Sequence, residues 1–105
     1  MIYLVTRHPG AKEWMQNQFH ETVKHITHLD KETTLLVGDC VAGSLPVHQV
    51  ASLNAAGVRY LHLCMDMPAN LRGQELSAEQ LDALGARLQD YHVLALSPLA
   101  HLIGD

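Results

Sequence analysis

The chain has 105 residues, of which 48% are hydrophobic and 5% aromatic, and its formal net charge is −4 with the histidines neutral. This length predicts one domain, residues 1–105, with a core small enough that dimerisation would help it. The acidic balance disfavours duplex DNA, whose partners are usually basic, and scarce aromatic side chains disfavour long single strands. With no secretory signal, no apolar run of the ~18 residues that span a bilayer and only Cys40 and Cys64, we expect a cytoplasmic protein that binds no membrane.

The first part of the chain predicts a strand, a helix and a second strand. Ile2–Val5 is a short apolar run rich in β-favouring side chains, which predicts a buried strand. A polar loop follows, and then a helix is expected over residues 11–19, with Trp14 and Met15 facing the core. Alternating polar and apolar residues at 25–29 predict an edge or half-buried strand.

The middle of the chain predicts a second strand–helix–strand unit. The small residues Cys40–Gly43 form a strand, and Pro46 suits the first turn of a helix, where its missing N–H is not needed. This helix is expected to reach about residue 56. Residues 58–65 carry the strongest strand pattern in the chain, which ends before Asp66.

The last third predicts one more helix and one more strand. Ser77 and Gln80 have the spacing of a capping box, and leucines at 81, 84 and 88 extend the helical pattern to about residue 91. A strand is expected at residues 92–96, and the tail 97–105 is left unassigned. Strands that alternate with helices predict a Rossmann-like α/β fold with a mostly parallel sheet flanked by helices.

Ligands of such folds bind outside the carboxyl ends of the strands. The loop after the first strand contains Thr6, Arg7, His8 and Gly10 ahead of a helix. Free backbone N–H groups and the helix dipole favour an anion there, and the planar guanidinium of Arg7 fits a phosphate. The alternative is a plain turn in which Arg7 pairs with a surface carboxylate. We predict an anion site with Arg7 and His8 as catalytic residues and Thr6 and Gly10 as ligand-binding residues.

A second loop follows the predicted strand at 40–43. Ser44 can cap the next helix or bond a ligand oxygen, and Leu45 lies beside it. His48 falls in the first helical turn, where the dipole favours a neutral imidazole and a bound phosphate would reverse that preference. The alternative is a plain cap with an exposed histidine. We predict Ser44 and Leu45 as ligand-binding residues and His48 as a catalytic residue.

Other polar residues give weaker signals. Asp66 ends a strand and Arg72 lies in a glycine-containing loop that could close over a ligand, so both are added to the predicted ligand-binding set. His25 and His28 lack the spacing and partners of a zinc site, and the sequence has no Cys-x-x-Cys. We therefore expect no metal and no cofactor.

The opening Tyr3-Leu4-Val5-Thr6-Arg7-His8-Pro9-Gly10-Ala11, with Glu13-Trp14 after it, resembles the start of a small CRISPR-associated family from type III systems. The similarity continues through 38–39, Gly43-Ser44-Leu45-Pro46-Val47-His48, 59–63 and 71–76, and covers the chain to about residue 91. The resemblance implies a compact relative of the Rossmann-like domains that sense cyclic oligoadenylate. It also implies a homodimeric, metal-independent ring nuclease that degrades cyclic tetra-adenylate and so switches off the antiviral response.

The chemistry of that substrate is compatible with these residues. A cyclic ribonucleotide carries its own nucleophile, a ribose 2′-hydroxyl beside each phosphodiester. The protein need only align this hydroxyl with the leaving 5′-oxygen and stabilise the charge that develops. A two-fold dimer suits a ring of repeated phosphates, because each subunit presents the same loops.

Three rival interpretations remain open. A histidine phosphatase also runs from a first strand into Arg-His-Gly, but here Pro9 precedes Gly10 and the chain is short for that fold. A non-catalytic protein that sequesters cyclic oligoadenylate would use the same cations. A structural subunit would use neither loop for binding.

Overall fold

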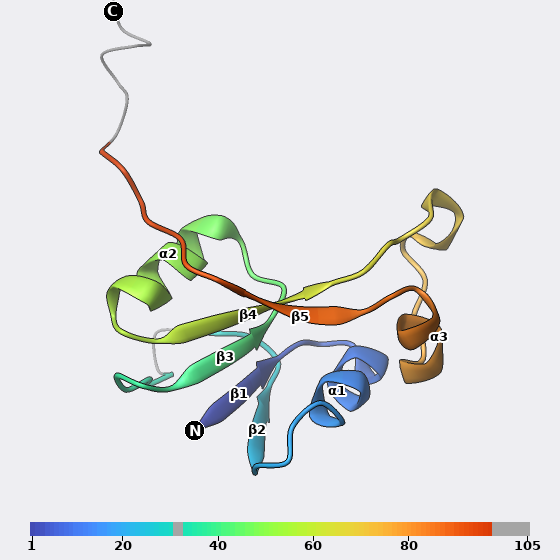
Figure 1. Ribbon diagram of the computed structural model, residues 1–105, viewed down its shortest axis with the longest axis horizontal. Coiled ribbons are helices and arrows are strands. Elements are labelled where there is room, and N and C mark those ends of the chain that lie inside the picture. The colour runs from blue at the N-terminus through green and yellow to red at the C-terminus, as the bar shows by residue number, and fades with distance from the viewer. Residues whose placement is uncertain (31–32, 98–105) are drawn as a thin grey trace, which may run out of the picture.

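The computed structural model, which describes residues 1–30 and 33–97, has a sheet of five strands flanked by helices (Figure 1). The strands are β1 (Ile2–Val5), β2 (Val23–Ile26), β3 (Cys40–Gly43), β4 (Arg59–Cys64) and β5 (Arg87–Tyr91). The helices are α1 (Pro9–Gln16), α2 (Val47–Ala55) and α3 (Ala78–Ala83), with a 3₁₀ turn η1 (Ala69–Leu71) before α3.

The strand order in the sheet is β2-β1-β3-β4-β5. β1 pairs in parallel with both β2 and β3, and β3 pairs in parallel with β4. Among the strands of residues 1–30 and 33–97, β5 alone runs antiparallel, and it pairs with β4. The prediction of an α/β fold with a mostly parallel sheet flanked by helices is confirmed, and the arrangement is compatible with a Rossmann-like fold. The parallel pairing brings the carboxyl ends of β1, β2, β3 and β4 to the same edge of the sheet.

Each face of the sheet is covered by different helices. Successive side chains of a strand point to opposite faces, so Leu4 packs with α1 and α3 whereas Val5 packs with α2. Figure 1 shows α1 and α3 on one side of the sheet and α2 on the other. The fully buried Leu4 and Met15 belong to the first cluster and the fully buried Val41 to the second. Each such buried side chain stabilises the fold by roughly 1.5–3 kcal/mol relative to exposure.

The predicted long helix before the last strand is wrong. The capping box forms as expected, with Ser77 accepting from the amide of Gln80 at 3.1 Å, but α3 ends at Ala83. Gly85 then takes a φ of +74°, a conformation that turns the chain out of the helix. Leu88, whose spacing matched the helical stripe, instead belongs to β5 and packs on the same cluster from the sheet.

Other predicted boundaries also shift. The expected last strand at 92–96 is wrong, because residues 92–97 have no regular structure and β5 lies one segment earlier. The strand expected at 25–29 lies at Val23–Ile26, and the helix expected over 11–19 begins earlier, at Pro9, and ends at Gln16. Residues 98–105 of the unassigned tail lie outside the described residues.

Candidate functional site

A cavity of about 560 Å³ opens at the carboxyl ends of the parallel strands. The register pairs Val5 with Gly43, so the residues that follow them, Thr6 and Ser44, leave neighbouring strands side by side. The polar lining of the cavity comes from the loops after β1, β2 and β3, from the segment before α3 and from α2, and it includes Thr6, Arg7, His8, Thr27, His28, Ser44, Gln49 and Glu75. Leu45 lines the cavity beside Ser44. The deeper wall is apolar and includes Met15, Leu63, Met65, Met67, Leu76 and Leu81. The structure therefore brings both sequence-predicted loops into one site.

Three hydrogen bonds fix the loop after β1. The amide of Thr6 donates to the carbonyl oxygen of Ile26 at 3.1 Å, and the amide of His8 donates to the Thr6 hydroxyl at 3.1 Å. The carbonyl oxygen of Thr6 lies 2.8 Å from Nε2 of His25 on β2. Because a carbonyl only accepts, Nε2 of His25 carries a proton. The loop that presents Arg7 is thus held from β2 on one side and by its own threonine on the other.

Arg7 itself is exposed and lines the cavity. None of the ion pairs within residues 1–30 and 33–97 involves Arg7. The alternative of a turn in which Arg7 pairs with a surface carboxylate therefore finds no support in the described part of the chain. Its guanidinium is available to an anion in the cavity.

His8 reaches across the cavity to the segment that leads into α3. Its Nδ1 lies 2.8 Å from Oε1 of Glu75, and both side chains are about two-thirds exposed, at 65% and 67%. A carboxylate only accepts, so Nδ1 of His8 carries the proton. In the neutral ring Nε2 is then the nitrogen without a proton, which can accept a hydrogen bond. Sequence reasoning missed Glu75, since only the folded chain brings it beside His8.

The loop after β3 is tied to a buried phenol. The hydroxyl of Tyr60 accepts from the amide of Leu45 at 2.9 Å, donates to the carbonyl oxygen of Gly43 at 3.1 Å and lies 2.7 Å from Nδ1 of His62. A phenol has one proton and two lone pairs, so all three contacts are satisfied only when His62 donates from Nδ1. Tyr60 is 2% exposed, and burial raises the pKa of its hydroxyl.

Ser44 does not cap α2. The N-cap of this helix is Pro46, and no side chain of the described residues accepts from its first amides. The first turn of α1 likewise lacks a side-chain cap. Of the two roles expected for Ser44, helix capping is therefore wrong, and the residue lines the cavity. Both helices begin at the edge where the cavity opens, so their dipoles favour negative charge there.

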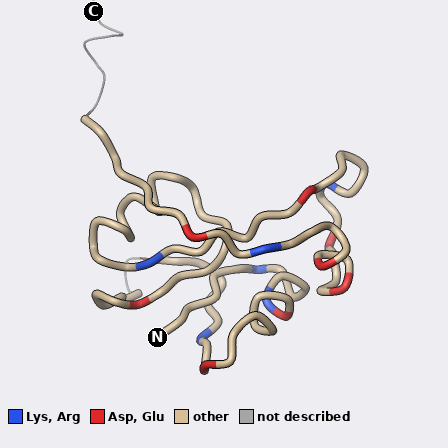
Figure 2. Tube along the Cα trace, in the orientation of Figure 1, with Lys and Arg blue, Asp and Glu red and all other residues tan. Residues whose placement is uncertain are grey.

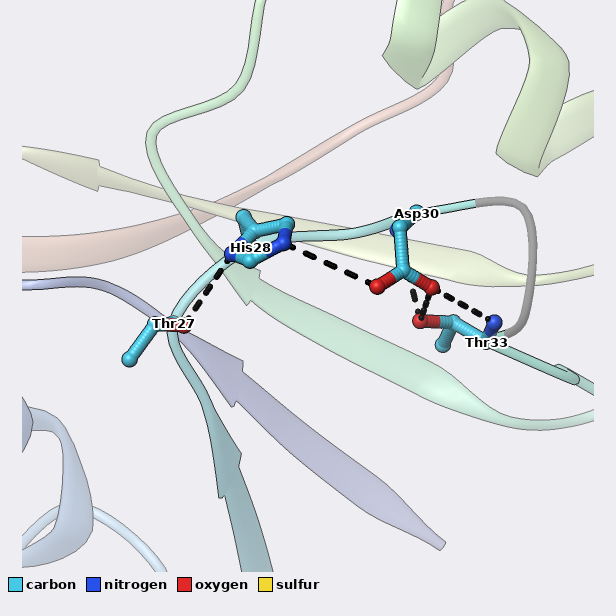
Figure 3. Close-up of polar contacts among 4 residues, drawn as sticks. All are labelled: Thr27, His28, Asp30 and Thr33. Carbon is cyan, nitrogen blue, oxygen red and sulfur yellow. Dashed lines mark hydrogen bonds and ion pairs between the residues drawn. The ribbon is translucent and has the colours of Figure 1, made fainter.

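A third loop, after β2, completes the cavity with Thr27 and His28. Figure 3 shows the Thr27 hydroxyl beside the His28 ring, with Oγ1 at 3.1 Å from Nδ1. On the other side of the ring, Nε2 of His28 lies 3.6 Å from Oδ2 of Asp30. Asp30 in turn accepts from the amide of Thr33 at 3.0 Å and from its hydroxyl at 3.1 Å. The sequence analysis missed this loop because it expected the strand at 25–29, whereas β2 ends at Ile26. With the correct strand end, the rule that ligands bind where parallel strands end would have included Thr27 and His28 in the predicted site.

Four predicted site residues do not line the cavity: Gly10, His48, Asp66 and Arg72. Gly10 has a structural role, because a Cβ at this position would stand 1.8 Å from the carbonyl oxygen of Leu76; the missing side chain lets α1 approach the segment before α3. His48 lies in a separate hollow of about 280 Å³ between α2 and residues 92–95. The amide of Asp66 donates to Leu84, and Arg72 is exposed at the end of η1.

Charge over the rest of the molecule is dispersed. Figure 2 shows the Lys and Arg residues of the described chain spread singly over the fold, with no continuous basic stripe. Within residues 1–30 and 33–97, no group of three or more His, Cys, Asp or Glu side chains could hold a metal ion. Every helix of that part is too short or too polar to cross a bilayer.

Residues 3–94 match the sequence model of the CRISPR-associated protein family Cas_VVA1548. The chain belongs to this family. The expected membership of a CRISPR-associated family is therefore confirmed. The Cas_VVA1548 match runs from within β1 to beyond β5 and includes the loops of the cavity. No curated protein and no solved structure matches the chain.

Proposed function

We propose that this Cas_VVA1548 protein is a metal-independent ring nuclease that cuts cyclic tetra-adenylate and so switches off the signal of a type III CRISPR system. Family membership supplies the CRISPR context, and the resemblance of the opening motif supplies the substrate class. The observation that carries the proposal is the placement of Arg7, His8 and Ser44 around one cavity at the carboxyl ends of β1 and β3.

The cavity suits a phosphodiester. Arg7 has no carboxylate partner among the described residues, and two helices begin at this edge without side-chain caps. A guanidinium and two helix dipoles together favour an anion without any wide basic surface. This accounts for an anion site on a chain whose net charge is negative.

The reaction needs no covalent bond between the protein and the substrate, because the nucleophile belongs to the substrate. The ribose 2′-hydroxyl attacks the neighbouring phosphorus, the 5′-oxygen leaves, and a 2′,3′-cyclic phosphate and a 5′-hydroxyl form. In this scheme Arg7 stabilises the charge that develops on the phosphoryl oxygens. His8 exchanges a proton through Nε2, with its ring oriented by Glu75. Thr6, Ser44 and Leu45 hold the ligand, and His48 takes no part, because it lies in the other hollow.

The size of the cavity favours a dimer. A volume of about 560 Å³ is in the range of sites for drug-sized ligands, which is less than a ring of four nucleotides needs. We infer that two copies related by a two-fold axis, with their Arg7 and Ser44 loops near the axis, enclose one ring together. Each copy then presents one cavity to half of the substrate.

The deciding experiment is incubation of the purified protein with cyclic tetra-adenylate, with and without excess chelator, followed by chromatography. We expect linear products in both conditions. Loss of cleavage in chelator that a divalent ion restores would contradict the metal-free mechanism. Intact ring that co-elutes with the protein would instead identify a sequestering protein, and no interaction would contradict the whole proposal.

A further inference from the structure

His28 lines the same cavity as His8 but comes from a different loop, the one after β2. The order β2-β1-β3 places the loop of His28 next to the Arg7–His8 loop, opposite the Ser44 loop. Leu29, the next residue, packs on the cluster beneath α2. His8 instead turns toward Glu75, whose neighbour Leu76 packs on the cluster beneath α1 and α3. Both imidazoles therefore line one cavity, His8 from the loop after β1 and His28 from the neighbouring loop after β2.

Each imidazole also lies beside a carboxylate. Glu75 lies 2.8 Å from His8, and Asp30 lies 3.6 Å from His28 and is itself positioned by Thr33 (Figure 3). Nε2 of His28 faces Asp30 at that distance, which is an ion-pair contact too long for a hydrogen bond. Nδ1 faces the Thr27 hydroxyl, which also lines the cavity and can act as donor or acceptor.

The displacement at phosphorus needs two such groups. In an in-line reaction the entering 2′-oxygen and the leaving 5′-oxygen stand on opposite sides of the phosphorus, so one residue cannot serve both in a single pass. A base on one side and an acid on the other are required for full proton-transfer catalysis. A single histidine beside Arg7 leaves one of these two positions empty.

We propose that His28 fills that position and is the second proton-transfer residue of the site, a deduction that rests on the proposed function. The neutral imidazole of the pair takes the proton of the 2′-hydroxyl as the bond from that oxygen to phosphorus forms. The protonated imidazole of the pair gives its proton to the 5′-oxygen as the bond from phosphorus breaks. The pair ends with its protonation states exchanged, and solvent restores them before the next turnover.

Substitution of His28 is expected to have little effect on the stability of the fold. The side chains of His28 and Asp30 are 59% and 51% exposed, and ion pairs this exposed contribute little to stability. The substitution His28→Gln keeps a polar side chain of similar length and removes the titrating ring. The fold is expected to survive, which circular dichroism and thermal unfolding verify. His20→Gln is the matched control, because His20 is an exposed histidine that does not line the cavity.

The test is steady-state cleavage of cyclic tetra-adenylate by wild type, His28→Gln and His20→Gln between pH 5 and pH 9. We expect kcat of His28→Gln to fall about 100-fold or more, the usual contribution of a proton-transfer residue, while KM changes less than about threefold. The wild-type profile of kcat/KM is expected to be a bell, and His28→Gln should lose one limb. The charged groups that face the two rings, Glu75, Asp30 and Arg7, remain in every variant.

The outcomes separate this inference from the proposed function. If wild type cuts the ring and His28→Gln cuts it equally fast, the inference is wrong and the ring nuclease proposal stands. If only KM rises, His28 binds the ring without moving a proton, which also overturns the inference. If wild type leaves the ring intact, both proposals fail together. A kcat loss with one limb missing, in a folded variant beside an unchanged control, supports both.

Discussion

The hydroxyl of Tyr60 lies 2.9 Å from the amide nitrogen of Leu45, so a buried side chain of β4 holds the loop that follows β3. The same oxygen donates to Gly43 at 3.1 Å. The loop that carries Ser44 is thereby anchored on both sides of that residue. This anchor places Tyr60 among the residues that position the candidate site without lining its cavity.

Removal of this hydroxyl should loosen the loop. In Tyr60→Phe the ring still fills its place, but the amide of Leu45 and the carbonyl of Gly43 lose their partner. We expect a loss of about 1–3 kcal/mol in the free energy of unfolding, as for buried polar groups left unpaired, measured by urea denaturation. Tyr91→Phe is the control, because Tyr91 is 49% exposed and makes no hydrogen bond through its hydroxyl within the described residues. Equal stability of Tyr60→Phe and wild type would contradict the anchoring role.

Arg7→Ala tests the anion site. A charge-assisted contact is worth roughly 1.5–3 kcal/mol, so cleavage of cyclic tetra-adenylate should fall about tenfold to hundredfold while thermal unfolding is unchanged. A loss confined to kcat would indicate that Arg7 acts in the transition state, whereas a rise in KM as well would indicate ground-state binding. Arg87→Ala provides the control, since Arg87 is exposed on β5 and does not line the cavity. A folded Arg7→Ala protein with wild-type activity would place the active site elsewhere.

Asp39 gives the fold a specific pH dependence. This buried carboxylate accepts from the amide of Leu36 at 2.8 Å, and that hydrogen bond lowers its pKa. A lowered folded-state pKa means that the stabilisation is present above the ordinary pKa of about 3.9 and is lost as the pH falls through the lower folded value. We expect Asp39→Asn to unfold at lower urea than wild type at pH 7, and the gap to shrink by pH 3. Asp66→Asn, at an exposed carboxylate, should show no such gap; a gap for Asp39→Asn that is independent of pH would refute the explanation.

Assembly can be measured directly. The proposed enclosure of one ring by two copies predicts a dimer at micromolar concentration by light scattering, with or without cyclic tetra-adenylate. Arg7→Ala should remain a dimer, because the substitution removes a contact to the anion and leaves the fold unchanged. A monomer in all conditions, together with one ring bound per chain, would show that a single cavity suffices.

The fold was predictable where patterns were local. The run Ile2–Val5 and the small residues Cys40–Gly43 form the strands expected of them, and alternation of elements predicted the parallel sheet. The error in the last third arose because Leu81, Leu84 and Leu88 fit a helical stripe although Leu88 points to the same core from a strand. Gly85 was the residue that argued against a long helix. A glycine inside a helix costs only about 1 kcal/mol relative to alanine, so the leucine pattern outweighed it in the prediction.

The site was predictable only in part, for a physical reason. Arg7 and Ser44 follow strands that the sequence placed correctly, so the rule about strand ends brought them together. Glu75 and Tyr60 could not be assigned, because their roles depend on contacts across 67 and 15 residues of chain. His48 was expected in the site because it follows the second loop, but the first turn of α2 carries it away to the other hollow.

The cavity is assembled from distant stretches of chain, since His8 and Glu75 meet across 67 residues. An unfolded chain has no counterpart of such a site, so a ligand that fills it binds the native state alone. By mass action this ligand adds about 2.7 kcal/mol to the native state at a hundredfold excess over its Kd. For a chain with a small core, a ligand of this cavity would therefore also stabilise the fold. When such a ligand leaves or is consumed, this stabilisation is lost, and the ligand-free chain is the form most exposed to unfolding and proteolysis.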